Sequence, residues 1–185
     1  MVVSNKKTAR RSVYHVALVG MLAATIEVSK LVLAVLPNVE VVTLLCALYG
    51  YVFGWIGVAA ALVFVAIEPL VWGMGTWVIS YILYWPFVAL TFWLLGRAHV
   101  RNRVLLTAVA LAFTLWFSVL TSLVDIGLFS GAYNRFFYRF SIYYVRGIPY
   151  YAIQLACNAV AFPLLFRPLA DRLAKLRARN NIFKK

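Results

Sequence analysis

The chain has 185 residues, of which 65% are hydrophobic and only 12% are charged. Soluble domains contain about 45–50% apolar residues, so this composition excludes an ordinary soluble protein and predicts one that lies in a bilayer. The net charge is +13, but the Lys and Arg residues lie mostly between the apolar runs and at the two ends. This distribution is typical of membrane topology signals and argues against a nucleic-acid partner.

The first apolar run follows a basic start, "MVVSNKKTARRSVYHVALVG", and extends from Val13 to Leu36. It is longer than the apolar core of a signal peptide, which has about 7–15 residues. It also exceeds the roughly 20 residues that cross a bilayer. We therefore expect a retained first span. We divide the chain into a basic N-terminus at 1–12, a transmembrane domain at 13–176 and a basic tail at 177–185.

The rest of the chain predicts five further helices separated by turn signals. Glycines at "YGYVFGW" divide one long apolar block, "WGMGTW" forms the next turn, and "GRAHVRNR" is a basic connector. The expected helices are 41–53, which is short for a crossing, 55–72, a fourth that runs to about Gly96, 104–129, and a sixth that begins near Ile148. Residues 130–147 are expected to form a long aromatic loop. The predicted fold class is an all-α integral membrane protein with six transmembrane helices.

The positive charges also predict an orientation. If the N-terminus is cytoplasmic, fourteen Lys and Arg residues lie on the inner side, and Lys30 lies within the first span. The outer side then carries Arg135, Arg139 and Arg146 alone. Because cytoplasmic connectors are enriched in Lys and Arg, we expect both termini in the cytoplasm. The outer connectors are then 37–40, 73–76 and 130–147.

Four of the five acidic residues lie in or beside the predicted spans, where an acid is costly and marks a functional or structural site. Glu27 precedes Lys30 by three residues, which predicts an ion pair on one helix face. Glu40 follows Asn38, which we expect to cap the next helix, and either complements that helix N-terminus or contacts a ligand. Glu68 and Asp125 lie near outer helix ends, where ligand contact and structural hydrogen bonding both remain open.

Aromatic residues concentrate in the predicted outer half, and the stretch "SGAYNRFFYRFSIYYVRG" adds three arginines. Part of this enrichment is the aromatic belt of membrane proteins. Rings combined with guanidinium groups also suit a planar or anionic organic ligand. The candidate ligand-binding residues are Asn38, Glu40, Trp72, Trp77, Tyr81, Tyr84, Asp125, Tyr133, Arg135 and Tyr150.

The first helix carries "ALVGMLAAT", in which Ala17, Gly20 and Ala24 offer a small-residue face that lets another helix approach closely. Together with "LPNVEVVTLL", "YGYVFGW" and "WGMGTWVISYILYWP", this pattern resembles the substrate-binding S component of energy-coupling factor (ECF) vitamin transporters of bacterial cell membranes. The resemblance covers nearly the whole chain. The A-x-x-x-A motif of that family is replaced here by Gly20-x-x-x-Ala24, which keeps the small surface.

The resemblance implies a vitamin bound from the outer side, no catalytic residue and no cofactor. It also implies that the helix-one face docks on a transmembrane coupling subunit driven by two cytoplasmic ATPase subunits. The aromatic loop and its arginines are similar to those of cobalamin-specific members, which makes cobalamin the expected ligand. Riboflavin, folate or a queuosine precursor is the alternative. A membrane enzyme and a membrane subunit without a ligand are the competing classes.

Overall fold

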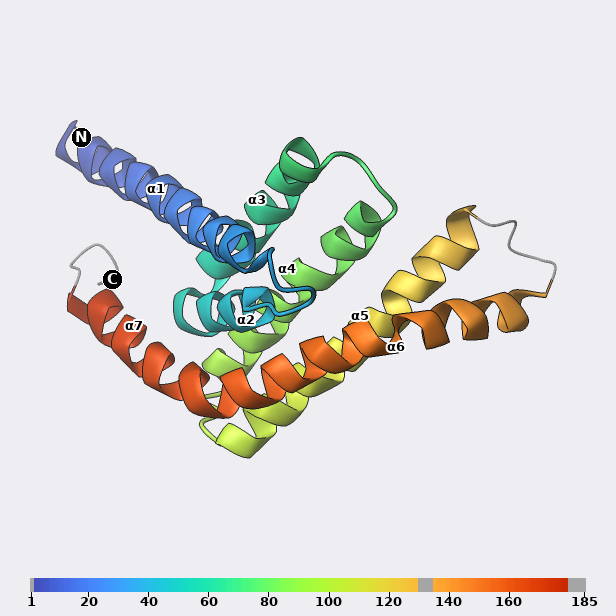
Figure 1. Cartoon of the computed structure of the whole chain (residues 1–185). Helices are drawn as coiled ribbons and strands as arrows, with labels where there is room; N and C mark the ends of the chain where they lie inside the picture. Colours follow the sequence, from blue (N-terminus) through green and yellow to red (C-terminus); the bar gives the residue numbers. More distant parts are fainter. Residues whose placement is uncertain (1, 130–134, 180–185) are drawn as a thin grey trace.

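The computed structural model describes residues 2–129 and 135–179, and their side chains from Ser12 onward. All elements in these ranges are helices, which confirms the all-α class (Figure 1). In chain order they are α1 Val2–Leu33, α2 Val42–Phe53, α3 Trp55–Trp72, α4 Trp77–Arg97, α5 Arg103–Phe129, α6 Phe136–Ala161, the π-helix η1 Phe162–Phe166 and α7 Arg167–Arg179.

Five helical segments of the described chain are long and apolar enough to cross a membrane, so the protein is a multi-pass membrane protein by helix length and composition. They are Ser12–Leu33, Trp55–Trp72, Trp77–Arg97, Arg103–Leu128 and the continuous run Phe136–Arg179. The apolar helix α2 has only 12 residues. At 1.5 Å per residue it measures about 18 Å, well short of the roughly 30 Å hydrocarbon layer.

Protein rather than lipid surrounds α2, because nine of its twelve residues are buried. Glycines let the neighbouring backbones approach it closely. A Cβ on Gly50 would lie 2.0 Å from the carbonyl oxygen of Ala89 in α4, and one on Gly57 of α3 would lie 2.2 Å from that of Tyr49. The glycines that the sequence marks as turn signals therefore also serve helix packing, and α2 forms the centre of the bundle.

The long aromatic loop predicted for 130–147 is wrong over most of its length, because α6 begins at Phe136 rather than near Ile148. Phe136, Phe140 and Tyr144 stack in sequence along α6, with ring centroids 6.2 and 5.7 Å apart. Their spacing of four residues is that of one helix face. The helix also continues through Pro149, the residue whose neighbourhood had indicated a helix start.

The two ends of the chain differ in how they pack. The N-terminal half of α1 projects away from the other helices, whereas α7 turns back beside the bundle after a bend at η1 (Figure 1). A π-helix with Pro163 inside it is a common cause of such a bend. Arg177 of α7 then donates a hydrogen bond to the carbonyl oxygen of Val52 at the end of α2.

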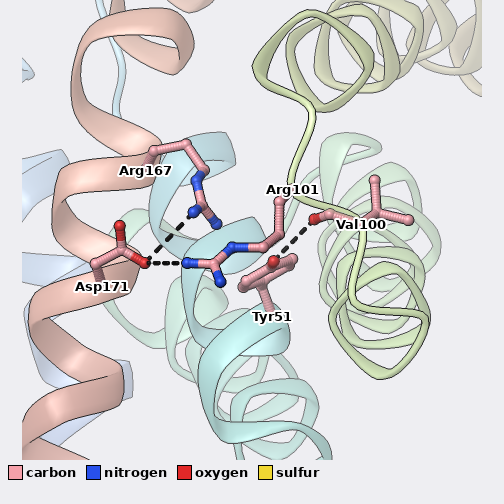
Figure 2. Close-up of polar contacts among 5 residues, drawn as sticks. All are labelled: Tyr51, Val100, Arg101, Arg167 and Asp171. Carbon is pink, nitrogen blue, oxygen red and sulfur yellow. Dashed lines mark hydrogen bonds and ion pairs between the residues drawn. The ribbon is translucent and has the colours of Figure 1, made fainter.

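Polar contacts also join α7 to the basic connector between α4 and α5 (Figure 2). Arg101 of the connector and Arg167 of α7 each lie 3.5 Å from a carboxylate oxygen of Asp171. The hydroxyl of Tyr51 in α2 donates to the carbonyl oxygen of Val100 at 2.8 Å. These contacts fix the C-terminal ends of α2 and α4 to the start of α7.

Candidate ligand-binding cavity

A cavity of about 450 Å³ opens at the other end of α2, beside its N-terminus. Its walls come from the end of α1, the connector that follows it, the end of α3 and the facing sides of α4, α5 and α6. The helix α1 ends at Leu33, three residues earlier than predicted, and Ala34 and Leu36 donate turn hydrogen bonds back to Leu31 and Leu33. The connector thereby folds over the cavity.

Lys30 provides the positive charge of the cavity wall. Its ammonium nitrogen lies 5.2, 5.7 and 5.1 Å from the ring centroids of Trp72, Trp77 and Tyr81, which is the distance range of cation–π attraction. The same ammonium forms an ion pair with Glu68 of α3. The predicted pair between Lys30 and Glu27 is wrong, because packing of α1 on α3 brings the more deeply buried carboxylate to the lysine.

Glu40 joins the cavity wall to two helices at once. Its carboxylate accepts the backbone N–H and the hydroxyl of Thr43 at 2.8 and 2.6 Å, at the N-terminus of α2. It also accepts the side-chain amides of Gln154 and Asn158 from α6, at 3.3 and 3.0 Å. The acid thus completes the first turn of α2, where a negative charge is favoured, and still lines the cavity.

The prediction that Asn38 caps α2 is wrong. The N-cap position belongs to Val41, whose side chain makes no capping hydrogen bond, and the free amide of Thr43 is satisfied by Glu40 instead. Asn38 has a backbone φ of 56°, a left-handed conformation that asparagine tolerates better than most residues. Its role in the connector is therefore to turn the chain from α1 towards α2.

The apolar part of the cavity wall includes aromatic rings from α4 and α5 in edge-on and tilted contact. Trp85 of α4 lies 5.5 Å from Tyr81 and 5.7 Å from Phe117 of α5, measured between ring centroids. The indole N–H of Trp85 is buried and has no hydrogen-bond partner among the described residues. Trp85 also lines the cavity, so its ring adds apolar surface to the site.

The cavity brings together only part of the predicted set. Asn38, Glu40, Trp72, Trp77 and Tyr81 line it. The others divide as follows: Tyr84 is fully buried behind Trp85, Asp125 accepts a hydrogen bond from Tyr143 of α6, Arg135 and Tyr150 lie on α6 outside the cavity lining, and Tyr133 falls outside the described residues.

Ten of the fifteen lining residues were not predicted, among them Lys30, Trp85, Phe117 and Gln154. Because Lys30 was predicted to pair with Glu27 on its own helix, it was not considered as a ligand contact. Gln154 carried a usable signal, because an uncharged polar side chain inside an apolar span normally faces protein or a cavity. The two aromatic residues gave none, since large rings in a span are more often packing residues.

The small-residue face of α1 is uncovered by the described chain. Ala17, Gly20 and Ala24 are all exposed, and a Cβ added to Gly20 would meet nothing within 4 Å. The neighbouring residues Leu22, Ala23 and Ile26 are buried in the core, so the opposite side of the same helix segment carries this face.

Comparison with known proteins gives no relative. No family model matches the sequence, and no curated protein and no solved structure matches it.

Proposed function

We propose that the protein is the substrate-binding S component of an ECF-type transporter and that it binds a small vitamin or vitamin precursor in the cavity beside α2. The observation that carries the proposal is the cavity itself. It measures about 450 Å³, and its mostly apolar lining, with five aromatic residues out of fifteen, holds a few polar groups. Small-molecule sites have this character and a volume of about 300–1,000 Å³.

The lining favours a planar ligand. Trp72, Trp77 and Tyr81 offer ring faces and edges, while Lys30, Glu40 and Gln154 are polar side chains in the same lining. Cobalamin, with its corrin ring and nucleotide, is much larger than a ligand that this cavity encloses. We therefore propose a ligand of the size of riboflavin, folate or a queuosine precursor. Binding of cobalamin, the ligand expected from the sequence, would contradict this size limit.

The proposal includes the rest of the transporter. In it the chain crosses the bacterial membrane six times, with α2 as the short sixth segment, and both termini lie in the cytoplasm. The uncovered face at Ala17, Gly20 and Ala24 docks on the transmembrane coupling subunit, which two cytoplasmic ATPase subunits drive. An exposed small-residue face on α1 supports this arrangement, because it permits close helix contact.

The experiment is a binding measurement on the purified protein in detergent. Mass spectrometry identifies any compound that co-purifies, and riboflavin, folate, a queuosine precursor and cobalamin are then titrated by tryptophan fluorescence. Saturable binding of one of them is the expected result. A folded sample that binds none of these and carries no compound would overturn the proposal.

Two substitutions locate the bound ligand. Trp85→Phe reduces the ring surface in the cavity wall, and Trp77→Leu removes a ring beside Lys30. Each is expected to raise Kd about 5- to 100-fold, since the lost contact is worth about 1–3 kcal/mol. The matched controls are Asp125→Asn and Tyr150→Leu, which lie outside the cavity and should leave Kd within about twofold. The reverse pattern would place the ligand at the α5–α6 end instead.

A separate substitution tests the docking face. Gly20→Leu fills the exposed surface of α1 without touching the cavity. In cells that contain the complete transporter it should abolish uptake while Kd stays unchanged. A parallel loss of affinity would show that the face supports the binding site rather than the partner.

A further inference from the structure

Two acidic side chains and one lysine meet where α1 packs on α3, and the lysine also lines the cavity. Glu27 and Lys30 lie on neighbouring turns of α1, and Glu68 belongs to α3. Glu68 is fully buried and Glu27 is 7% exposed. Both acids lie inside segments that are long and apolar enough to cross the membrane. We refer to Glu27, Lys30 and Glu68 as the acid–lysine centre.

Three carboxylate oxygen atoms of this centre have no hydrogen-bond donor among the described residues. Lys30 donates to Oε2 of Glu68, whereas Oε1 of Glu68 and both carboxylate oxygens of Glu27 are buried without a donor among the described residues. Glu27 lies one helical turn before Lys30, so its side chain and that of Glu68 adjoin the same ammonium group and interact with each other. Ionised carboxylates are acceptors only, so two of them in contact need a proton between them.

The charges lead to the same requirement. Two ionised carboxylates against one ammonium would leave a net negative charge buried in an apolar helix pair, which is strongly unfavourable. Tyr81 of α4 interacts electrostatically with both acids and with Glu40 and is uncharged, as are Trp72 and Trp77, whose rings lie beside Lys30. None of the ion pairs of the described residues provides Glu27 with a cation. One bound proton makes the centre neutral.

We propose that the acid–lysine centre is a proton-binding site: at neutral pH Glu27 and Glu68 hold one proton between them, and Lys30 balances the remaining negative charge. The site follows the rule that two carboxyl groups sharing one position do not both ionise. It requires no bound organic ligand, so it stands or falls separately from the proposed transport function.

Infrared spectroscopy of the full-length protein without ligand tests the site, because a protonated carboxylic acid has a C=O stretching band that ionised carboxylates lack. At neutral pH the wild-type protein should show this band, and it should shift when H2O is replaced by D2O. Glu27→Gln should abolish it, since Glu68 is then left as a simple ion pair with Lys30. Lys30→Met should enlarge it about twofold, because both acids must then be neutral.

The matched control is Glu40→Gln. Glu40 lines the same cavity but accepts hydrogen bonds from Thr43, Gln154 and Asn158, so its substitution should leave the band unchanged. Thermal unfolding of each variant establishes that it is folded. A wild-type protein without the band would overturn the proposal, as would a folded Glu27→Gln protein that retains it or a band lost in Glu40→Gln. The Glu68→Gln variant provides a second route, since Glu27 alone beside Lys30 should also lose the band.

Discussion

Glu40 connects two helices that are far apart in the chain. One carboxylate group accepts donors from Thr43 at the start of α2 and from Asn158 of α6, 118 residues later. Hydrogen bonds to a charged group are worth about 1.5–3 kcal/mol each, more than neutral ones. The residue therefore contributes to the stability of the fold as well as to the cavity wall.

Substitution of Glu40 separates these contributions. Glu40→Ala leaves the amide of Thr43 and the side chains of Gln154 and Asn158 without their acceptor, and we expect it to lower the free energy of unfolding by about 2–4 kcal/mol. Asn38→Gly, two residues earlier, removes the side chain without straining the left-handed backbone and should change it by less than about 0.5 kcal/mol. Thermal unfolding followed by intrinsic fluorescence compares the two. An equal loss in both variants would mean that Asn38 is the cap after all.

Single residues were predicted well where the cause is local and poorly where it is not. Glu40 was correctly placed at a helix N-terminus, because capping depends on a few neighbouring residues. Lys30 was given the wrong partner, since Glu27 is close in sequence whereas Glu68 reaches it only through the packing of α1 on α3. The same limit applies to Trp85 and Gln154, which join the cavity through contacts between helices.

At the scale of helices, close backbone contact determines the position of α2. Gly50 faces Ala89 of α4 and Gly57 of α3 faces Tyr49, with no room for a Cβ at either glycine. A methyl group there must push two helices apart, and overpacking of this kind costs about 1–3 kcal/mol or more.

The test compares two glycine-to-alanine substitutions. Gly50→Ala should reduce the yield of monodisperse protein and lower Tm by several degrees. Gly127→Ala is the control, because a Cβ at Gly127 meets nothing within 4 Å and alanine favours a helix by about 1 kcal/mol over glycine. It should leave Tm unchanged or raise it. If Gly50→Ala behaved in the same way, α2 and α4 could not be in the contact described here.

The start of α6 gives a second prediction at this scale. Tyr138 and Val145 are both exposed and lie seven residues apart, which is about 10 Å in a helix but roughly 23 Å in an extended chain. Spin labels at cysteines introduced at these two positions, after both native cysteines have been replaced, should give the shorter distance. The longer or a broad distribution would restore the aromatic loop that the sequence predicted.

Helix boundaries were predictable where glycine or proline ends a helix, and not where these residues lie inside one. The predicted bounds 55–72 are those of α3, and the predicted helix 41–53 begins one residue before α2. The boundary between them was predictable because Gly54 adopts a φ of 67° that other residues avoid. Near Gly147 and Pro149 the same residue types lie inside α6. In a membrane helix proline is tolerated more readily than in water, so Gly147 and Pro149 wrongly predicted a helix boundary.

For the whole molecule, composition alone predicted a helical membrane protein, and five long apolar segments agree with it. The orientation remains a prediction from the distribution of Lys and Arg. It places the end of the bundle with Arg101, Arg167 and Asp171 in the cytoplasm and the cavity on the outer side. The distribution of Lys and Arg reflects how chains insert into the membrane. The helical fold by itself does not show which end of the bundle is cytoplasmic.

Labelling of single cysteines decides the orientation. In a variant without the two native cysteines, Met74→Cys lies in the connector between α3 and α4 and is 84% exposed before substitution. We expect a membrane-impermeant maleimide to label it in intact cells. Ala98→Cys, which follows α4, is exposed at the other end and should react only after the membrane is permeabilised. The opposite labelling pattern would invert the topology and place the cavity in the cytoplasm.

The shortness of α2 has a consequence for how the protein is made. A segment of about 18 Å surrounded by protein has too little apolar length to settle in lipid alone, and its principal neighbour α4 is synthesised after it. We therefore expect α2 to remain at the insertion machinery, shielded from water, until α4 has been synthesised. On this expectation α2 enters the bilayer together with α4 rather than as a separate span.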